Sequence, residues 1–207
     1  MATLLALVLS YLLGAIPVAY LVARLNQVNI FEVGSGNMGT TNVLRAVGPV
    51  MGMLVLLLDV LKSALAVVVA RMLVPQPYDT ITLLAAIVAI AGHNWSVFAW
   101  MVTGKLRGGK GAASAMGTAI MILPVWVIVA CVVMFVSIVA KTRLMSLGVL
   151  VTVVIGSMMA FTSMFLGQTP MIYAVYILAL DGLIFYRFRS NIQRLRAGNE
   201  RRVGDRA

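Results

Sequence analysis

The sequence predicts an all-α protein, a polytopic integral membrane helix bundle with seven transmembrane segments, its N-terminus outside and its C-terminus cytoplasmic. Composition is the first reason, because 62% of the 207 residues are hydrophobic, 11% are charged and the mean hydropathy is +1.03. A soluble domain carries about 25% charged residues, and a water-soluble globule of this size cannot bury so much apolar surface. The lengths of the apolar segments and the distribution of Lys and Arg are the other two reasons.

Five apolar segments reach, or nearly reach, the length of about 20 residues that a helix needs to cross a bilayer. They are residues 3–25, 47–73, 80–102, 144–166 and 169–186. The first has no basic start and no small-residue cleavage site, so we expect a retained span rather than a signal peptide. The remaining stretch, 111–140, contains Pro124, which removes a backbone donor and breaks or kinks a helix. We therefore expect a short outgoing helix over 111–123, too short to cross unaided, and a returning helix over 125–140.

Positive charge lies on one side of this topology. Of the 16 Lys and Arg, all but Lys62 and Arg71 fall in or beside the connections placed inside or in a basic tail over residues 187–207. The outer connections, 1–2, 74–79 and 167–170, contain none. Because cytoplasmic loops are enriched in Lys and Arg, the tail is placed in the cytoplasm, and the net charge of +10 does not indicate nucleic-acid binding. The length predicts a single domain, 1–207.

The first inner connection is rich in glycine, hydroxyl and amide side chains, and reads GSGNMGTTNVLR over 34–45. Its glycines allow positive φ and close backbone approach, and successive amides can form an anion-binding nest. Ser35, Asn37 and Asn42 add hydrogen-bonding groups, and Arg45 supplies a fork suited to phosphate. The alternative is a flexible polar loop between two helices.

The second inner connection reads TGKLRGGKG over 103–111 and feeds a small-residue helix. The free amides and the dipole of a helix N-terminus favour an anion, and Lys110 stands at its mouth. Lys105 and Arg107 are expected to be membrane anchors. In the tail, Asn191 and Glu200 are not explained by contact with anionic headgroups.

His93, Asp59 and Lys62 are among the ionisable residues inside predicted spans, where charge is costly and suggests function. His93 is either a site residue or a neutral core histidine. Asp59 and Lys62 are three residues apart on one helix face, and we expect a structural or site-supporting ion pair. The lone Cys131 excludes an internal disulfide. One histidine, one cysteine and six scattered acids offer no convincing metal site, so neither a metal nor a cofactor is expected.

Three motifs in this order resemble the bacterial acyl-phosphate:glycerol-3-phosphate acyltransferases. They are GSGNMGTTNVLR (34–45), GHNWSVF followed by RGGKGAA (92–98 and 107–113) and SNIQRLRAGNE (190–200); YLLGAIP, LLLDVLKSA and MSLG fit more weakly. The resemblance implies an enzyme of the bacterial inner membrane with its active site facing the cytoplasm. It implies transfer of a fatty acyl group from acyl phosphate to position 1 of glycerol 3-phosphate, giving lysophosphatidate and phosphate. Substrates and membrane lipid are the expected partners, with no nucleic acid and no obligatory protein partner.

The resemblance also implies site residues, carried over position by position. Its phosphate-binding residues match Ser35, Arg45, Lys110 and Asn191, and two further positions match Thr41 and Ser146. The expected catalytic residues are Ser35, Arg45, Lys110 and His93. The expected substrate-binding residues are Ser35, Asn37, Thr41, Asn42, Arg45, Gly108, Gly109, Lys110, Ser146 and Asn191. The chain departs from the family pattern at Phe188, where the family usually has histidine, and in a longer interval between His93 and Lys110.

Two questions stay open at this point. The proton of the acceptor hydroxyl passes either to His93 or to a phosphate oxygen of the substrate, and we favour the phosphate oxygen. A small membrane transporter for a phosphorylated metabolite is the alternative function, and a scaffold that holds anionic lipid through the tail is a third. Transporters commonly place their sites near the midplane and show internal repeats. Polar groups at one face, without a convincing repeat, favour the enzyme.

Overall fold

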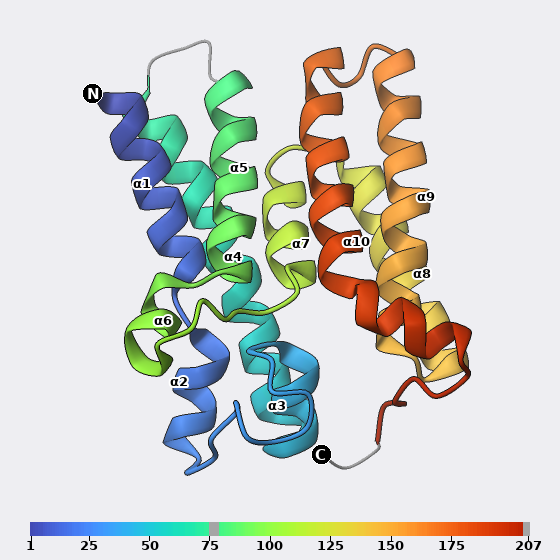
Figure 1. The fold of residues 1–207 in the computed structure, drawn as a ribbon. Coiled ribbons are helices and arrows are strands. Elements are labelled where there is room, and N and C mark those ends of the chain that lie inside the picture. Colours follow the sequence, from blue (N-terminus) through green and yellow to red (C-terminus); the bar gives the residue numbers. More distant parts are fainter. Residues whose placement is uncertain (75–78, 205–207) are drawn as a thin grey trace. The chain divides into compact units, whose positions relative to one another are not determined.

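The computed structural model describes residues 1–74 and 79–204 (Figure 1). The regular secondary structure of these residues is helical, and the β-pairing among them is one isolated bridge between Ser96 and Arg107, so the all-α prediction is confirmed. Five helical segments are long and apolar enough to cross a membrane, and they describe a multi-pass protein: Ala2–Leu25, Pro49–Leu73, Val125–Thr142, Met145–Phe165 and Met171–Arg196. Seven crossings and the orientation of the termini stay predictions, and residues 75–78 of the expected outer connection 74–79 lie outside the described residues.

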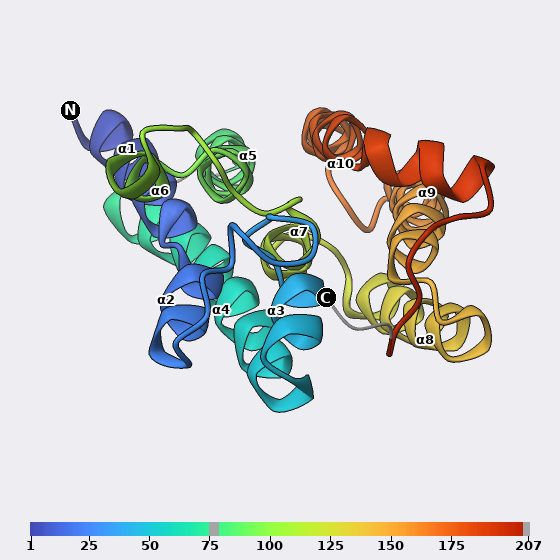
Figure 2. The same cartoon turned by 60° about the horizontal axis from the view of Figure 1, so that its bottom comes forward.

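The described chain divides into two compact units, residues 1–121 and 122–204, and each is described by itself. The first unit contains α1 (Ala2–Ala15), α2 (Val18–Leu25), α3 (Thr40–Ala46), α4 (Pro49–Leu73), α5 (Asp79–Asn94), α6 (Val97–Thr103) and α7 (Ala112–Ile120). Helix α4 is central, because it packs against α1, α3, α5 and α7 (Figures 1 and 2).

Small residues allow the helices of the first unit to approach closely. A Cβ on Gly14 of α1 would overlap the backbone of Ala89 on α5, and a Cβ on Gly117 of α7 would overlap the backbone of Val60 on α4. Glycine at helix contacts is the usual means of close packing in membranes, where lipid removes the hydrophobic drive for association. Glycine therefore fixes how α1 and α7 lie in this unit.

Two predicted spans are interrupted. The segment over 3–25 breaks at Ile16 and Pro17, so that α1 and α2 are separate helices. The single helix expected over 80–102 is wrong, because α5 ends at Asn94 and α6 is a new short helix. Ser96 causes the second break: its hydroxyl accepts a hydrogen bond of 3.1 Å from the Ala99 N–H and caps α6, as serine does at many helix N-termini.

The second unit contains α8 (Val125–Thr142), α9 (Met145–Phe165), a 3₁₀ turn η1 (Met171–Tyr173) and α10 (Ala174–Arg196). Helix α9 packs against both α8 and α10. The predicted break at Pro124 is confirmed, since α7 ends at Ile120 and Pro124 caps α8. With 9 residues, α7 extends about 14 Å at 1.5 Å per residue. The last helix runs ten residues beyond its predicted end at 186, so the first half of the expected tail is helical.

Candidate active site

The first glycine-rich connection, which joins α2 to α3, is organised by the side chain of Asn42. Its amide nitrogen lies 3.1–3.2 Å from three carbonyl oxygens of the connection, those of Ile30, Val33 and Asn37. Its amide oxygen accepts a hydrogen bond of 3.0 Å from the Ser35 N–H. Only 3% of Asn42 is exposed. These contacts give Asn42 the role of shaping the connection, and substrate binding by its side chain stays a prediction.

The connection presents Ser35 at a sharp turn. Gly34 and Gly36 on either side of it have positive φ values of 59° and 65°, a conformation that glycine adopts without steric cost. Ser35 is exposed, while the half-buried Asn37 donates to the Ser35 carbonyl at 3.2 Å. A donor-rich turn of this kind leaves the serine hydroxyl available at the surface of the unit.

Helix α3 carries two further predicted residues. Thr41 lies in its first turn and Arg45 in its last turn, four residues apart and therefore on one face. Both are half-buried. The first connection and α3 thus keep Ser35, Thr41 and Arg45 close in the chain, while Asn42 points inward.

The second glycine-rich connection, which leads from α6 to α7, is fastened to the end of α5 by backbone hydrogen bonds. The Ser96 N–H donates to the Arg107 carbonyl at 3.0 Å, and the Gly109 N–H donates to the His93 carbonyl at 3.0 Å. These two bonds fix the course of the connection just before Lys110.

Gly108 and Gly109 are required because other atoms lie directly against their backbone. A Cβ on Gly108 would overlap the carbonyl oxygens of His93 and Asn94. A Cβ on Gly109 would overlap the His93 ring and stand 2.6 Å from the Met38 carbonyl oxygen. Since Met38 belongs to the first connection, the two glycine-rich connections meet here. This packing explains both glycines, and their contact with substrate stays a prediction.

A second contact joins the same two connections. The Arg107 guanidinium lies 5.3 Å from the centre of the Phe31 ring, which stacks on Tyr20 at 5.6 Å. Cation–π contacts of this length are attractive. In Figure 2 the first connection (blue) and the second (green) run across the same end of the unit. Arg107, predicted to be a membrane anchor, therefore also packs between the connections.

Lys110 stands at the start of α7. It is half-buried between two glycines, and Gly111 is the N-cap of α7 with a φ of 84°. The position combines a positive side chain with the amides of a helix N-terminus, and both favour an anion. The geometry therefore suits the anion-binding role predicted for Lys110.

Beneath the connections lies a buried polar layer, which we define as Asp59, Lys62, His93 and Ser96. Lys62 Nζ lies 2.7 Å from Asp59 Oδ1, and the two side chains are 7% and 2% exposed. The predicted ion pair is confirmed. His93 extends it, because its Nδ1 lies 3.6 Å from the same Asp59 oxygen. The single histidine is thus neither isolated nor on a lipid-facing surface.

The polar layer also satisfies the broken end of α1. Lys62 Nζ donates to the Ile16 carbonyl at 2.7 Å, and the Ser96 hydroxyl donates to the Ala15 carbonyl at 2.5 Å. Carbonyls at a helix end lack an intrahelical partner, and lipid offers none. The role of Ser96 was not predicted from the sequence. Its signal was a serine directly before an apolar run, the position of an N-cap.

In the second unit, Glu200 contacts both of the remaining predicted substrate-binding residues. The Ser146 hydroxyl donates to Glu200 Oε1 at 2.9 Å, and the Asn191 amide donates to the same oxygen at 2.5 Å. Arg194 Nε donates to Glu200 Oε2 at 2.7 Å. Ser146 comes from the start of α9, Asn191 from α10 and Glu200 from the chain after α10. Glu200, which was left out of the predicted site, thus brings Ser146 and Asn191 together, and substrate binding by these two residues stays a prediction.

The chain after α10 is held in place at one more point. The Val203 N–H donates to the Arg143 carbonyl at 2.7 Å, and Arg143 Nε donates back to the Val203 carbonyl at 3.0 Å. Arg143 ends α8 in a left-handed conformation, so the turn between α8 and α9 anchors the end of the described chain. Glu200 is thereby held against the start of α9.

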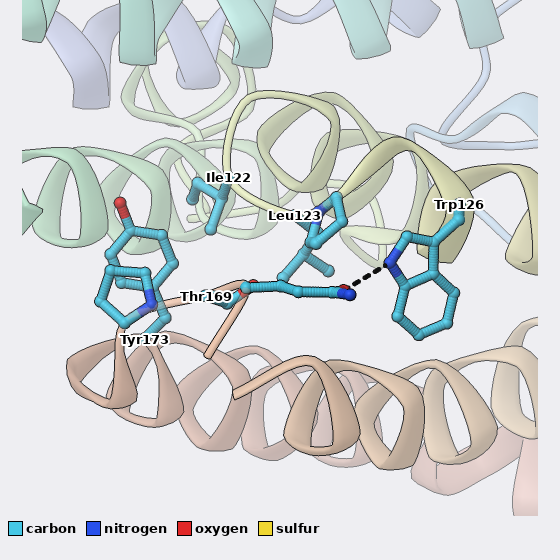
Figure 3. Close-up of a pocket in the computed structure, with 8 residues that line it drawn as sticks. Ile122, Leu123, Trp126, Thr169 and Tyr173 are labelled. Carbon is cyan, nitrogen blue, oxygen red and sulfur yellow. Dashed lines mark hydrogen bonds between the residues drawn. The ribbon is translucent and has the colours of Figure 1, made fainter. Parts of the chain in front are cut away.

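A pocket of about 520 Å³ lies at the other end of the second unit (Figure 3). It is lined by Ile122, Leu123, Pro124, Trp126, Gln168, Thr169, Pro170 and Tyr173. Trp126 Nε1 donates to Gln168 Oε1 at 3.0 Å across it. No charged residue lines it, and none of the predicted site residues does, so we do not assign it to an anionic substrate.

The predicted site residues therefore divide between the units. The first holds Ser35, Asn37, Thr41, Asn42, Arg45, His93, Gly108, Gly109 and Lys110, and the second holds Ser146 and Asn191. Within residues 1–74 and 79–204 there is no group of three or more His, Cys, Asp or Glu that could bind a metal ion.

Known proteins resemble this chain along nearly its whole length. The family model described as glycerol-3-phosphate acyltransferase matches residues 4–198. A glycerol-3-phosphate acyltransferase of Halalkalibacterium halodurans is 39% identical over 197 residues, covering 94% of this chain and 92% of that protein. One from Thermus thermophilus is 40% identical over 203 residues, covering 97% and 94%.

Solved structures agree with the sequence relatives. The glycerol 3-phosphate form of PlsY (YgiH), an integral membrane glycerol 3-phosphate acyltransferase, matches with a TM-score of 0.86 and 31% identity, covering 99% of this chain and 96% of that one. Its lysophosphatidic acid form matches with a TM-score of 0.83 and 30% identity, covering 98% and 95%. This chain belongs to the glycerol-3-phosphate acyltransferase family of integral membrane proteins.

Proposed function

We propose that this protein transfers a fatty acyl group from acyl phosphate to the 1-position hydroxyl of glycerol 3-phosphate, giving lysophosphatidate and phosphate. The observation that carries the proposal is the family match over residues 4–198. The structural relatives, solved in a glycerol 3-phosphate form and a lysophosphatidic acid form, support this acceptor and this product. The acyl-phosphate donor rests on the three sequence motifs.

The two joined glycine-rich connections supply what two phosphate-bearing substrates need. Arg45 and Lys110 bring positive charge, and Ser35 and Thr41 bring hydroxyl donors. Gly108 and Gly109 let the backbone that carries Lys110 lie close to the rest of the unit. Substrate alignment and fixed positive groups account for much of the rate in reactions of this kind.

The reaction itself needs no covalent enzyme intermediate. The 1-hydroxyl oxygen attacks the carbonyl carbon of the acyl phosphate, and the bond from that carbon to the phosphate oxygen breaks. The hydroxyl proton passes to an oxygen of the departing phosphate. Positive groups around both phosphates stabilise the charge that develops during transfer.

The location follows from charge and hydropathy. Five apolar helical segments and the concentration of Lys and Arg on one side of the predicted topology support a bacterial inner-membrane protein with both glycine-rich connections facing the cytoplasm. A water-soluble acceptor then enters from the cytoplasm, and the fatty chain of the donor stays in the bilayer.

The experiment is phosphate release from a synthetic acyl phosphate by the purified protein, with and without glycerol 3-phosphate, with lysophosphatidate measured as product. Lys110→Ala is expected to lower the rate about 100-fold or more, by the scale of losing one charge-stabilising donor. Lys105→Ala is the matched control, because this exposed lysine lies in the same connection. Release that is independent of glycerol 3-phosphate, or no release by folded protein across several acyl lengths, would refute the proposal. Uptake of glycerol 3-phosphate into vesicles would then test the transporter.

A further inference from the structure

The contacts of the polar layer form a continuous chain from α1 to the second glycine-rich connection. Lys62 holds the Ile16 carbonyl at 2.7 Å and Asp59 at 2.7 Å. The same Asp59 oxygen lies 3.6 Å from His93 Nδ1. The opposite edge of the His93 ring, with Nε2, lies where a Cβ on Gly109 would be. Each member therefore contacts the next, and Lys110 directly follows the last.

His93 is enclosed by Asp59 on one side of its ring and by Gly109 on the other. Only 6% of it is exposed. The narrow space bordered by His93, Asp59, Lys62 and Met38 is too small to hold a water molecule. A general base must come within about 2.6–3.2 Å of the proton that it removes, directly or through one water. On this side of the ring there is therefore no room for a bridging water.

We propose that Lys62, Asp59 and His93 form a positioning relay that supports the backbone of Gly109 and thereby fixes Lys110 for anion binding. Asp59 and Lys62 fix the side chain of His93 on its Nδ1 side, and His93 supports the second glycine-rich connection. Its function is affinity for the anionic substrate rather than proton transfer. The identity of that substrate, glycerol 3-phosphate, rests on the proposed function.

The buried ion pair of Asp59 and Lys62 suits a positioning role because of its charges. An ion pair removed from water gains little net stability, but it specifies one geometry strongly, because breaking it leaves an uncompensated charge. Lys62 must stay near Asp59 and the Ile16 carbonyl, and Asp59 must stay near Lys62. The ring of His93 faces the same carboxylate oxygen at 3.6 Å, and this contact favours one orientation of the ring.

The test compares variants that remove members of the relay. His93→Ala removes the support, and His93→Gln restores bulk and hydrogen bonding without a base of similar strength. Asp59→Asn combined with Lys62→Met removes both charges together, so that neither remains buried alone. Asp181→Asn is the matched control, since Asp181 is a carboxylate within a span of the second unit, bonded to Ser157 at 2.8 Å.

The measurements are KM and kcat, the Kd for glycerol 3-phosphate without donor, and hydrogen exchange of residues 104–112. We expect His93→Ala and the double variant to raise KM and Kd about tenfold or more, with little change in kcat and faster exchange. His93→Gln should recover most of the affinity, and Asp181→Asn should change neither quantity.

A different pattern would overturn the relay. Loss of a general base lowers turnover by about two to four orders of magnitude, so a fall of that size with unchanged KM, not rescued by His93→Gln, would contradict a positioning role. Unchanged exchange at 104–112 in both relay variants would also overturn it. If the wild type makes no lysophosphatidate from acyl phosphate, the proposed function fails separately. The exchange comparison, and a Kd for inorganic phosphate, still decide on the relay in that case.

Discussion

Replacing Gly109 with alanine tests directly whether close backbone packing positions Lys110. The added methyl group would overlap the His93 ring and stand 2.6 Å from the Met38 carbonyl oxygen, about 0.8 Å nearer than ordinary contact at 3.4 Å. Either Gly109 or Met38 must shift. Both belong to connections that are fixed by backbone and side-chain hydrogen bonds, so the shift reaches the neighbouring Lys110.

The expected loss of activity in Gly109→Ala follows from this displacement. A misplacement of about 1 Å at reacting groups costs about 100-fold in rate, so we expect the catalytic efficiency toward glycerol 3-phosphate to fall about 30- to 100-fold. Overpacking of a filled site costs about 1–3 kcal/mol of stability, so the free energy of unfolding should fall by that amount. The protein should still fold, and the loss of activity should exceed what the unfolded fraction explains.

The assay is lysophosphatidate formation by purified protein, together with thermal unfolding in the same detergent. Gly182→Ala is the matched control, because a Cβ at this position on α10 meets no atom within 4 Å and alanine favours a helix by about 1 kcal/mol. Gly109→Ala with activity within about threefold of the wild type would refute the reasoning. An equal loss in Gly182→Ala would show that the effect is not local.

Two further predictions concern the residues that organise each unit. Asn42→Ala leaves several backbone groups of the first connection without their hydrogen-bond partner, and a buried unsatisfied group costs about 1–3 kcal/mol of stability. We expect faster proteolysis within residues 30–37 and about tenfold weaker binding of glycerol 3-phosphate. Unchanged proteolysis would contradict this prediction. Glu200→Ala removes the shared acceptor of Ser146 and Asn191, and steady-state kinetics should show that KM rises at least about fivefold. Arg194→Ala should raise KM less than Glu200→Ala does. An equal rise in KM in both variants would mean that only the ion pair between Arg194 and Glu200 affects substrate binding.

The periodic and compositional features of the fold were predictable from the sequence. Long apolar runs and Pro124 predicted α4, α8 and α9 to within a few residues, because helix formation in lipid depends on local sequence and on satisfied backbone groups. The break between α5 and α6 was missed. Ser96 caps α6 through the Ala99 N–H and its hydroxyl also donates to the Ala15 carbonyl of α1, and apolar length alone reveals neither contact.

In the candidate site, too, some features were predictable from the sequence and others were not. Motif chemistry predicted that Ser35, Arg45 and Lys110 bind anions, but it did not separate side chains that could face a substrate from those that shape the connection. Asn42 has the residue type of a ligand-binding side chain, yet its hydrogen bonds lie within its own connection. Only the three-dimensional arrangement shows where a donor is directed, because that depends on contacts between residues distant in sequence.

Phe188 shows how the second unit differs from the family pattern in physical terms. It lies on α10 one turn before Asn191, and both are 5% exposed, so an apolar ring fills the position where the family resemblance predicts histidine. The neighbouring Arg189 does not replace that polar group, because its guanidinium lies 4.4 Å from the Tyr186 ring and donates to the Tyr186 carbonyl at 3.2 Å.

The cluster of Ser146, Asn191 and Arg194 therefore centres on Glu200. Its carboxylate holds Ser146 and Asn191 on one oxygen and Arg194 on the other. The side chain of Phe188 is apolar, and Glu200 holds these three donors together from the chain beyond α10. The anchoring of Val203 on Arg143 then contributes to this cluster, because a segment after α10 that moved freely would release the acceptor.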